Sequence, residues 1–166
     1  MFDTSTCTLL QSHTACTPSI PDQWYRPWTK ILTTLFPSSE GYFLAPQRRT
    51  TKKALIIEVQ KLSNPPTLPL LTVLVIEVRN TPDWPASIHA QETQIKRRTD
   101  AALAGSEVSK AKSKVYWISV IGPHWRYGDK DDDEQDPRPL IDWRHTTHDL
   151  DSYEHLRDLA GLVGSL

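Results

Sequence analysis

The sequence has few of the features that mark secreted or membrane proteins. Its 166 residues include only two cysteines, Cys7 and Cys16, which could close only a small loop near the start of the chain. A disulfide framework is therefore excluded, and a reducing compartment is expected. No apolar run approaches the roughly 18 residues of a transmembrane helix, so no membrane partner is predicted.

The start of the chain also lacks a targeting segment. Residues 1–21 have neither the basic region nor the apolar run of a signal peptide. They are rich in Thr and Ser, and we expect a mobile leader there, followed by a single domain over residues 22–166. The lack of these segments predicts an intracellular protein of the cytoplasm or the nucleus.

The chain has almost no excess of charge of either sign, because its formal net charge is −1. A near-neutral chain is not histone-like or polybasic. The neutrality conceals a segregation, since residues 1–128 carry a net +6 and residues 129–166 a net −7. We expect an acidic C-terminal extension from about residue 129. It could lie across the basic part and compete with nucleic acid, which is an autoinhibition hypothesis.

Hydrophobic periodicity predicts both helices and strands. Helical segments have apolar residues at spacings of three, four or seven, whereas strand segments are rich in β-branched and aromatic residues. The region 128–139 is acidic and predicted to be irregular. Helices are predicted over 22–36, 88–104 (capped by Ser87) and about 151–163, and strands over 42–50, 53–60, 70–79, 114–122 and, briefly, 125–127.

The order of these elements indicates the fold class. Residues 53–60 and 70–79 are almost continuously apolar, as in strands buried on both faces, and the Pro-rich KLSNPPTLP between them indicates a hairpin. Pro46 favours an edge position for the strand at 42–50. A helix, three strands, a helix and a strand predict an α/β (α+β) fold, with a mixed sheet flanked by helices.

Two glutamates interrupt these apolar strands, in LIIEVQ around Glu58 and LVIEVR around Glu77. A buried carboxylate is costly unless it is paired, hydrogen-bonded or bound to a metal. The length of the hairpin predicts that the two glutamates face each other, or are offset by about one residue. Opposed carboxylates repel each other, and Mg²⁺ between them would remove the repulsion. Alternatively, each glutamate reaches solvent or pairs with a nearby Lys or Arg.

Three segments resemble the PD-(D/E)XK superfamily of restriction-endonuclease-like nucleases, and more narrowly small fungal proteins with this core. They are the strand ending IEVR at 76–79, the helix with HAQETQIKRR at 89–98, and the strand YWISVIG at 116–122. The resemblance covers residues 22–128. It implies a restriction-endonuclease-like core and a Mg²⁺-dependent phosphodiesterase, in which the metal activates water and stabilises charge at the phosphate.

The resemblance also implies roles for individual residues. The family binds its metal through an acid on the second core strand and a Glu on the third, which correspond to Glu58 and Glu77. A Lys two residues after that Glu positions the attacking water, and Arg79 occupies this position. A polar helix residue supports the site, for which Gln94 or Gln91 is available. The implied catalytic residues are thus Glu58, Glu77, Arg79 and Gln94, with Glu58 and Glu77 as metal ligands.

Two departures from the family pattern bear on activity. No Pro-Asp pair precedes the hairpin, so Glu58 is the available second-strand acid. Arg replaces Lys, and arginine cannot act as a general base, although it can clamp a phosphate. In an alternative assignment, Gln60 follows Glu58 at the same spacing and makes LIIEVQ the catalytic strand. A degenerate, inactive descendant fits these departures as well as an enzyme does.

Basic residues provide the candidate nucleic-acid contacts. As a phosphate-binding track they would give salt-dependent affinity, but they are equally typical of ordinary solvated faces. Two functions remain open, namely a nuclease-like domain that acts on or binds nucleic acid, and a non-catalytic interaction module of the same fold. The candidate contacts are Arg48, Arg49, Lys96, Arg97 and Arg98.

Two further patterns indicate metal sites only weakly. His145 and His148 in HTTH lack the clustered cysteines or further ligands of a zinc site. The stretch GDKDDDEQD at 128–136 lacks the glycine and the final glutamate of an EF-hand loop, so a solvated loop is predicted. His124, which follows the strand at 114–122, could reach a phosphate or simply pack at the strand end.

Overall fold

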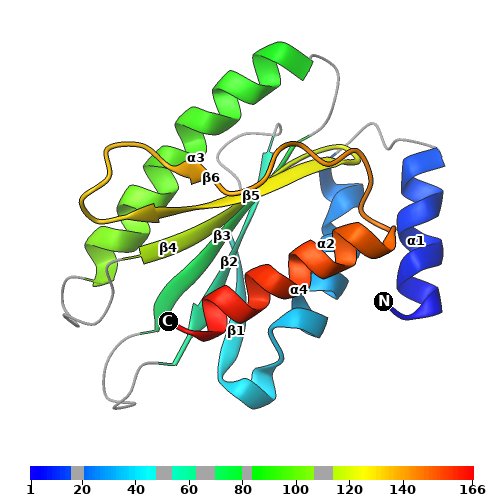
Figure 1. Ribbon diagram of the computed structural model, residues 1–166, viewed down its shortest axis with the longest axis horizontal. Coiled ribbons are helices and arrows are strands. Elements are labelled where there is room, and N and C mark those ends of the chain that lie inside the picture. Colours follow the sequence, from blue (N-terminus) through cyan, green and yellow to red (C-terminus); the bar gives the residue numbers. More distant parts are fainter. Residues whose placement is uncertain (16–20, 48–53, 63–69, 80–83, 107–113) are drawn as a thin grey trace.

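A mixed six-stranded sheet separates one helix from three others (Figure 1). The computed structural model describes residues 1–15, 21–47, 54–62, 70–79, 84–106 and 114–166. Helix α3 covers one face of the sheet, and helices α1, α2 and α4 lie on the other side. The predicted α/β class with a mixed sheet flanked by helices is confirmed.

The strands are arranged across the sheet in chain order. Neighbouring strands are antiparallel except β3 and β4, which are parallel and joined by α3. The strands are β1 (Tyr42–Gln47), β2 (Ala54–Lys61), β3 (Leu71–Arg79), β4 (Lys114–Ile121), β5 (His124–Asp131) and β6 (Arg138–Pro139). The helices are α1 (Thr4–Ala15), α2 (Pro21–Leu35), α3 (Trp84–Ser106) and α4 (Leu150–Gly164), with a short 3₁₀ turn η1 at Ser38–Glu40.

The main core lies between the sheet and α2 and α4. The predicted stripe of α2 is buried there, including Trp28 and Ile31, and so is that of α4, including Leu156 and Leu159. The acidic C-terminal part of the chain therefore supplies a core helix. Removing residues 129–166 would remove β6, α4 and the last three residues of β5, so truncation cannot test autoinhibition on a folded domain.

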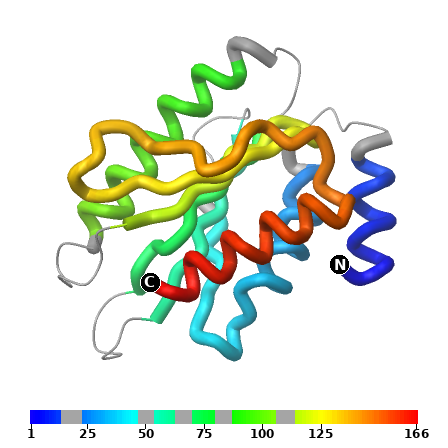
Figure 2. The backbone as a smooth tube through the Cα atoms, in the orientation of Figure 1, coloured from blue at the N-terminus to red at the C-terminus, as the bar shows by residue number. Residues whose placement is uncertain are grey.

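The start of the chain differs from the prediction of a mobile leader. Residues 4–15 form α1, and Phe2 and Leu10 are buried in the main core. The Asp3 carboxylate accepts a hydrogen bond from the backbone N–H of Thr6 at 2.9 Å, which satisfies a free donor of the first turn. The Phe2 ring meets the Tyr153 ring of α4 edge to face at 4.9 Å. In Figure 2, α1 (blue) accordingly lies beside the start of α4 (orange-red).

Two element boundaries also differ from the prediction. Helix α3 begins at Trp84 rather than after Ser87, because Pro85 falls in the first turn, where a missing N–H breaks no helical hydrogen bond. Strand β5 continues to Asp131, so residues 128–131 are not irregular.

No helix in the described part of the chain is long and apolar enough to cross a membrane.

Gly128 of β5 leaves room for the side chain of Trp117 on β4. The two residues are directly opposed across the antiparallel pair. A Cβ atom at Gly128 would lie 2.0 Å from the Arg138 carbonyl oxygen and 2.4 Å from the Trp117 ring. Only a residue without a side chain therefore allows both β6 and the indole to approach this closely.

Substituting Gly128 should accordingly destabilise the domain. We expect Gly128→Ala to lower the free energy of unfolding by about 3 kcal/mol, because strand backbone and a buried ring must both move. Urea unfolding of the wild type and the variant measures this difference. Gly161→Ala in α4 is the matched control, since its Cβ meets nothing within 4 Å. It should stabilise the helix by roughly 0.5–1 kcal/mol, and an equal loss in both variants would contradict the packing argument.

Candidate functional site

Glu77 lies at the centre of the sheet face that α3 covers. Its backbone pairs with Ile56 of β2 on one side and Ser119 of β4 on the other. The Glu77 side chain is 1% exposed, so its carboxylate has almost no contact with solvent. This burial follows from the parallel β3–β4 pair, since a crossover helix covers the strands it connects.

Arg79 is the ion-pair partner of Glu77. Its Nε donates to Glu77 Oε1 at 2.7 Å, and its terminal NH2 group donates to the Ala90 carbonyl oxygen of α3 at 3.3 Å. The guanidinium thus connects the strand to the helix. The second carboxylate oxygen, Oε2, is buried and has no hydrogen-bond partner in the described part of the chain.

Burial dominates the protonation of Glu77. Desolvation raises the pKa of Glu77 from 4.5 to about 7, although Arg79 and, more weakly, Arg98 and Arg97 act to lower it. A carboxyl group with this pKa carries its proton for part of the time near neutral pH. In the protonated form it binds metal ions poorly, because ligation needs the carboxylate.

Gln91, rather than Gln94, is the helix glutamine that contacts the sheet. Gln91 is fully buried, and its Nε2 donates to the carbonyl oxygens of Glu77 at 2.8 Å and Val120 at 3.1 Å. The Gln94 side chain instead accepts a hydrogen bond from Arg97 along the same helix at 2.7 Å. Gln91 lies four residues before Ile95, which is also buried. Because residues four apart share a helix face, this spacing in the sequence could have predicted that Gln91 faces the sheet.

Glu58 shares the sheet face of Glu77 but is turned away from it. Glu58 pairs with Val75, so the two glutamates are diagonal neighbours and not directly opposed. The Glu58 carboxylate accepts long hydrogen bonds from Thr72 at 3.4 Å and Gln60 at 3.5 Å. Thr72 and Arg79 lie toward opposite ends of β3, so the two carboxylates diverge along the strand. The predicted facing register, or an offset of about one residue, was wrong, because Val75, two residues before Glu77, lies opposite Glu58.

The basic candidates on α3 are mostly occupied by internal partners. Lys96 pairs with Asp136, and Arg97 bonds to Gln94. Arg98 is half-buried, and its Nε has no hydrogen-bond partner among the described residues. Arg48 and Arg49 lie outside the described residues.

A Mg²⁺ ion does not fit the residues that these predictions assigned to it. Mg²⁺ keeps several waters and is held through one or two accessible carboxylates. Here Glu77 is dry and paired with a cation, and Glu58 points elsewhere. The described residues contain no group of three or more His, Cys, Asp or Glu side chains that could hold a metal. The Arg79 guanidinium already provides a positive charge beside the Glu77 carboxylate, through Oε1.

A cavity of about 300 Å³ lies beside this site, between α3, β4, β5 and the segment before β6. Ser119 and Trp117 line its floor and Arg126 one wall. The Arg126 guanidinium donates to Glu92 at 2.8 Å and lies over the Trp143 ring, 4.7 Å from its centroid. Each cation at the cavity therefore has an anionic or aromatic partner within the protein.

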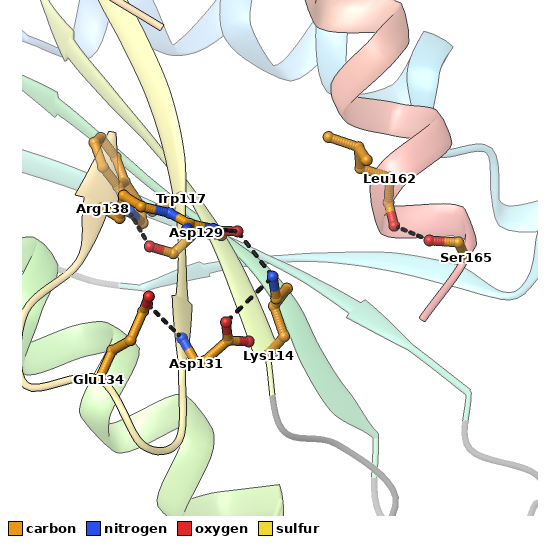
Figure 3. Close-up of polar contacts among 8 residues, drawn as sticks. All are labelled: Lys114, Trp117, Asp129, Asp131, Glu134, Arg138, Leu162 and Ser165. Carbon is orange, nitrogen blue, oxygen red and sulfur yellow. Dashed lines mark hydrogen bonds and ion pairs between the residues drawn. The ribbon is translucent and has the colours of Figure 1, made fainter. Parts of the chain in front are cut away.

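The first part of the acidic stretch 128–136 belongs to a structural ion-pair network, whereas residues 132–136 are irregular and mostly exposed, as predicted for a solvated loop. The buried Asp129 carboxylate accepts from Lys114 at 2.9 Å and from both Nε and NH2 of Arg138, at 3.1 and 3.0 Å (Figure 3). Desolvation opposes these bonds, yet they hold the pKa of Asp129 below its usual value. Lys114 also pairs with Asp131 at 3.3 Å. These contacts attach the acidic segment to β4 and β6.

No family model, curated protein or solved structure matches this chain.

The protonation of Glu77 should appear as a pH dependence of stability that Glu77→Gln removes. Because the pKa of Glu77 is raised from 4.5 to about 7 on folding, its contribution is fully present below pH 4.5 and is lost as the pH rises to about 7. The loss corresponds to about 3 kcal/mol. We expect the wild type to lose this much relative to Glu77→Gln in urea unfolding over that range.

Glu58→Gln is the matched control for this comparison, since Glu58 lies on the same sheet face but is half-buried. Its unfolding curves should keep the wild-type pH dependence. If Glu77→Gln also kept it, the assignment of the titration to Glu77 would be wrong.

Proposed function

We propose that this chain is a non-catalytic interaction module that keeps a restriction-endonuclease-like arrangement of strands and helices. The observation that carries this proposal is the dry Glu77–Arg79 ion pair, formed by the two residues that the resemblance assigns to a metal site. Glu77 and Arg79 then act as structural residues that connect β3 to α3. The Arg that replaces Lys is suited to this role, because its planar fork bonds a carboxylate and a carbonyl together.

A candidate surface for a partner lies beside α3, on the face of β1 and of the β2 residues paired with it, within the described part of the chain. Phe43 of the edge strand β1 is exposed, and Ala45 and Gln60 on the same face are half-buried. Exposed edges and partly apolar sheet faces are common sites of protein association. A protein partner is therefore our first candidate.

Nucleic acid is the second candidate partner, and one observation favours it. Arg97 is exposed on α3, and the half-buried Arg98 lies beside it. Phosphate contacts from these side chains would give binding that weakens steeply with salt. This binding would need no metal and no ionised Glu77.

A cleavage assay separates the module from a nuclease. We expect neither the wild type nor Glu77→Gln to cleave single-stranded or double-stranded DNA or RNA with Mg²⁺ or Mn²⁺. We also expect Mg²⁺ to leave the unfolding midpoint unchanged, since a ligand that binds only the folded state would raise it. Metal-dependent cleavage by the wild type that Glu77→Gln abolishes would overturn the proposal.

Fluorescence anisotropy with labelled DNA and RNA measures nucleic-acid binding, which is the second candidate function. The comparison is between the wild type and Arg97→Ala.

A further inference from the structure

Backbone register brings two histidines together at the start of β5. Trp125 and Arg144 form an antiparallel bridge in which both hydrogen bonds are made, at 3.0 and 2.7 Å. The next cross-strand pair is therefore His124 and His145, in a non-hydrogen-bonded position, where opposed side chains lie closest. Because the Trp125 side chain is buried in the main core, the His124 side chain projects from the opposite face of the strand.

The two imidazole rings meet through their Nδ1 atoms. These atoms are 2.9 Å apart in a hydrogen bond that one ring donates and the other accepts, and the ring planes are inclined at 84°. A metal ion would replace the shared proton, with both rings then protonated on Nε2. His145 is exposed and His124 is half-buried, so a solute ion can reach the pair.

We propose that His124 and His145 form a chelating site for a divalent transition-metal ion with right-angled ligands, Cu²⁺ or Ni²⁺. Nitrogen–metal bonds are about 2.0–2.1 Å long, so two nitrogens at right angles around one metal lie about 2.8–3.0 Å apart. Tetrahedral ligands would lie about 3.3–3.4 Å apart by the same bond lengths. The observed 2.9 Å matches the right-angled arrangement.

The rest of the coordination shell would come from water or from a small oxygen ligand. The described residues provide no group of three metal-binding side chains, so the pair does not form a closed structural zinc site. His148 of the HTTH motif is not part of the pair, because its Nδ1 contacts the Thr146 hydroxyl at 2.8 Å and not another imidazole. The site is independent of Glu77 and of the proposed interaction surface.

Titration of the tag-free full chain with Cu²⁺ tests this site. We expect one tightly bound equivalent, with an electron paramagnetic resonance spectrum of a tetragonal ion that has two imidazole nitrogens as ligands. His145→Ala removes an exposed ligand and should weaken this binding by more than about tenfold, as should His124→Ala. His148→Ala is the matched control from the same segment and should bind as the wild type does. Ni²⁺ titration should give the same ranking of the variants.

Three outcomes would each contradict the His124–His145 site. Equal Cu²⁺ affinity in the wild type and His145→Ala, with both chains folded by circular dichroism, would overturn the site. Loss of binding in His148→Ala but not in His145→Ala would place the metal on the HTTH motif instead. A spectrum with one nitrogen ligand in the wild type would show that the pair does not chelate.

Discussion

The structure depends on burying both faces of the parallel β3–β4 pair between two helical layers. Every polar group on these strands must then find its partner within the protein, because water cannot reach it. Gln91 donates to two carbonyl oxygens, one on each strand, and thereby holds α3 against the two strands that it connects. Glu77 and Arg79 meet it as a pair, which leaves one carboxylate oxygen without a partner among the described residues.

The fold was largely predictable because its strongest signals are local. The β2 and β3 segments are apolar and β-branched, and α2 and α4 have clear stripes, so period and composition identified them. The start of the chain was not predictable in this way. Helix α1 is rich in Thr and Ser, and Phe2 and Leu10 became core residues only because α2 and α4 provide a surface for them.

The candidate site was predictable in its residues but not in its geometry. The apolar strand around Glu77 indicated a buried carboxylate, and pairing with a nearby Lys or Arg was one of the two expectations for it. The choice between metal and ion pair depended on register, which a Pro-rich connection and an irregular strand do not fix from sequence. Asp129 was missed for another reason, since its partners Lys114 and Arg138 come from two other strands and no spacing rule relates them.

The contact between Phe2 and Tyr153 has a consequence for how the chain folds during synthesis. Residues near the two ends of the sequence meet in one core, so most of the chain must leave the ribosome before that core can close. Contacts of such long sequence separation slow folding, and unfinished chains expose apolar surface meanwhile. Helix α1 can pack on α2 soon after both are made, but Phe2 lacks its ring partner Tyr153 until α4 has been translated.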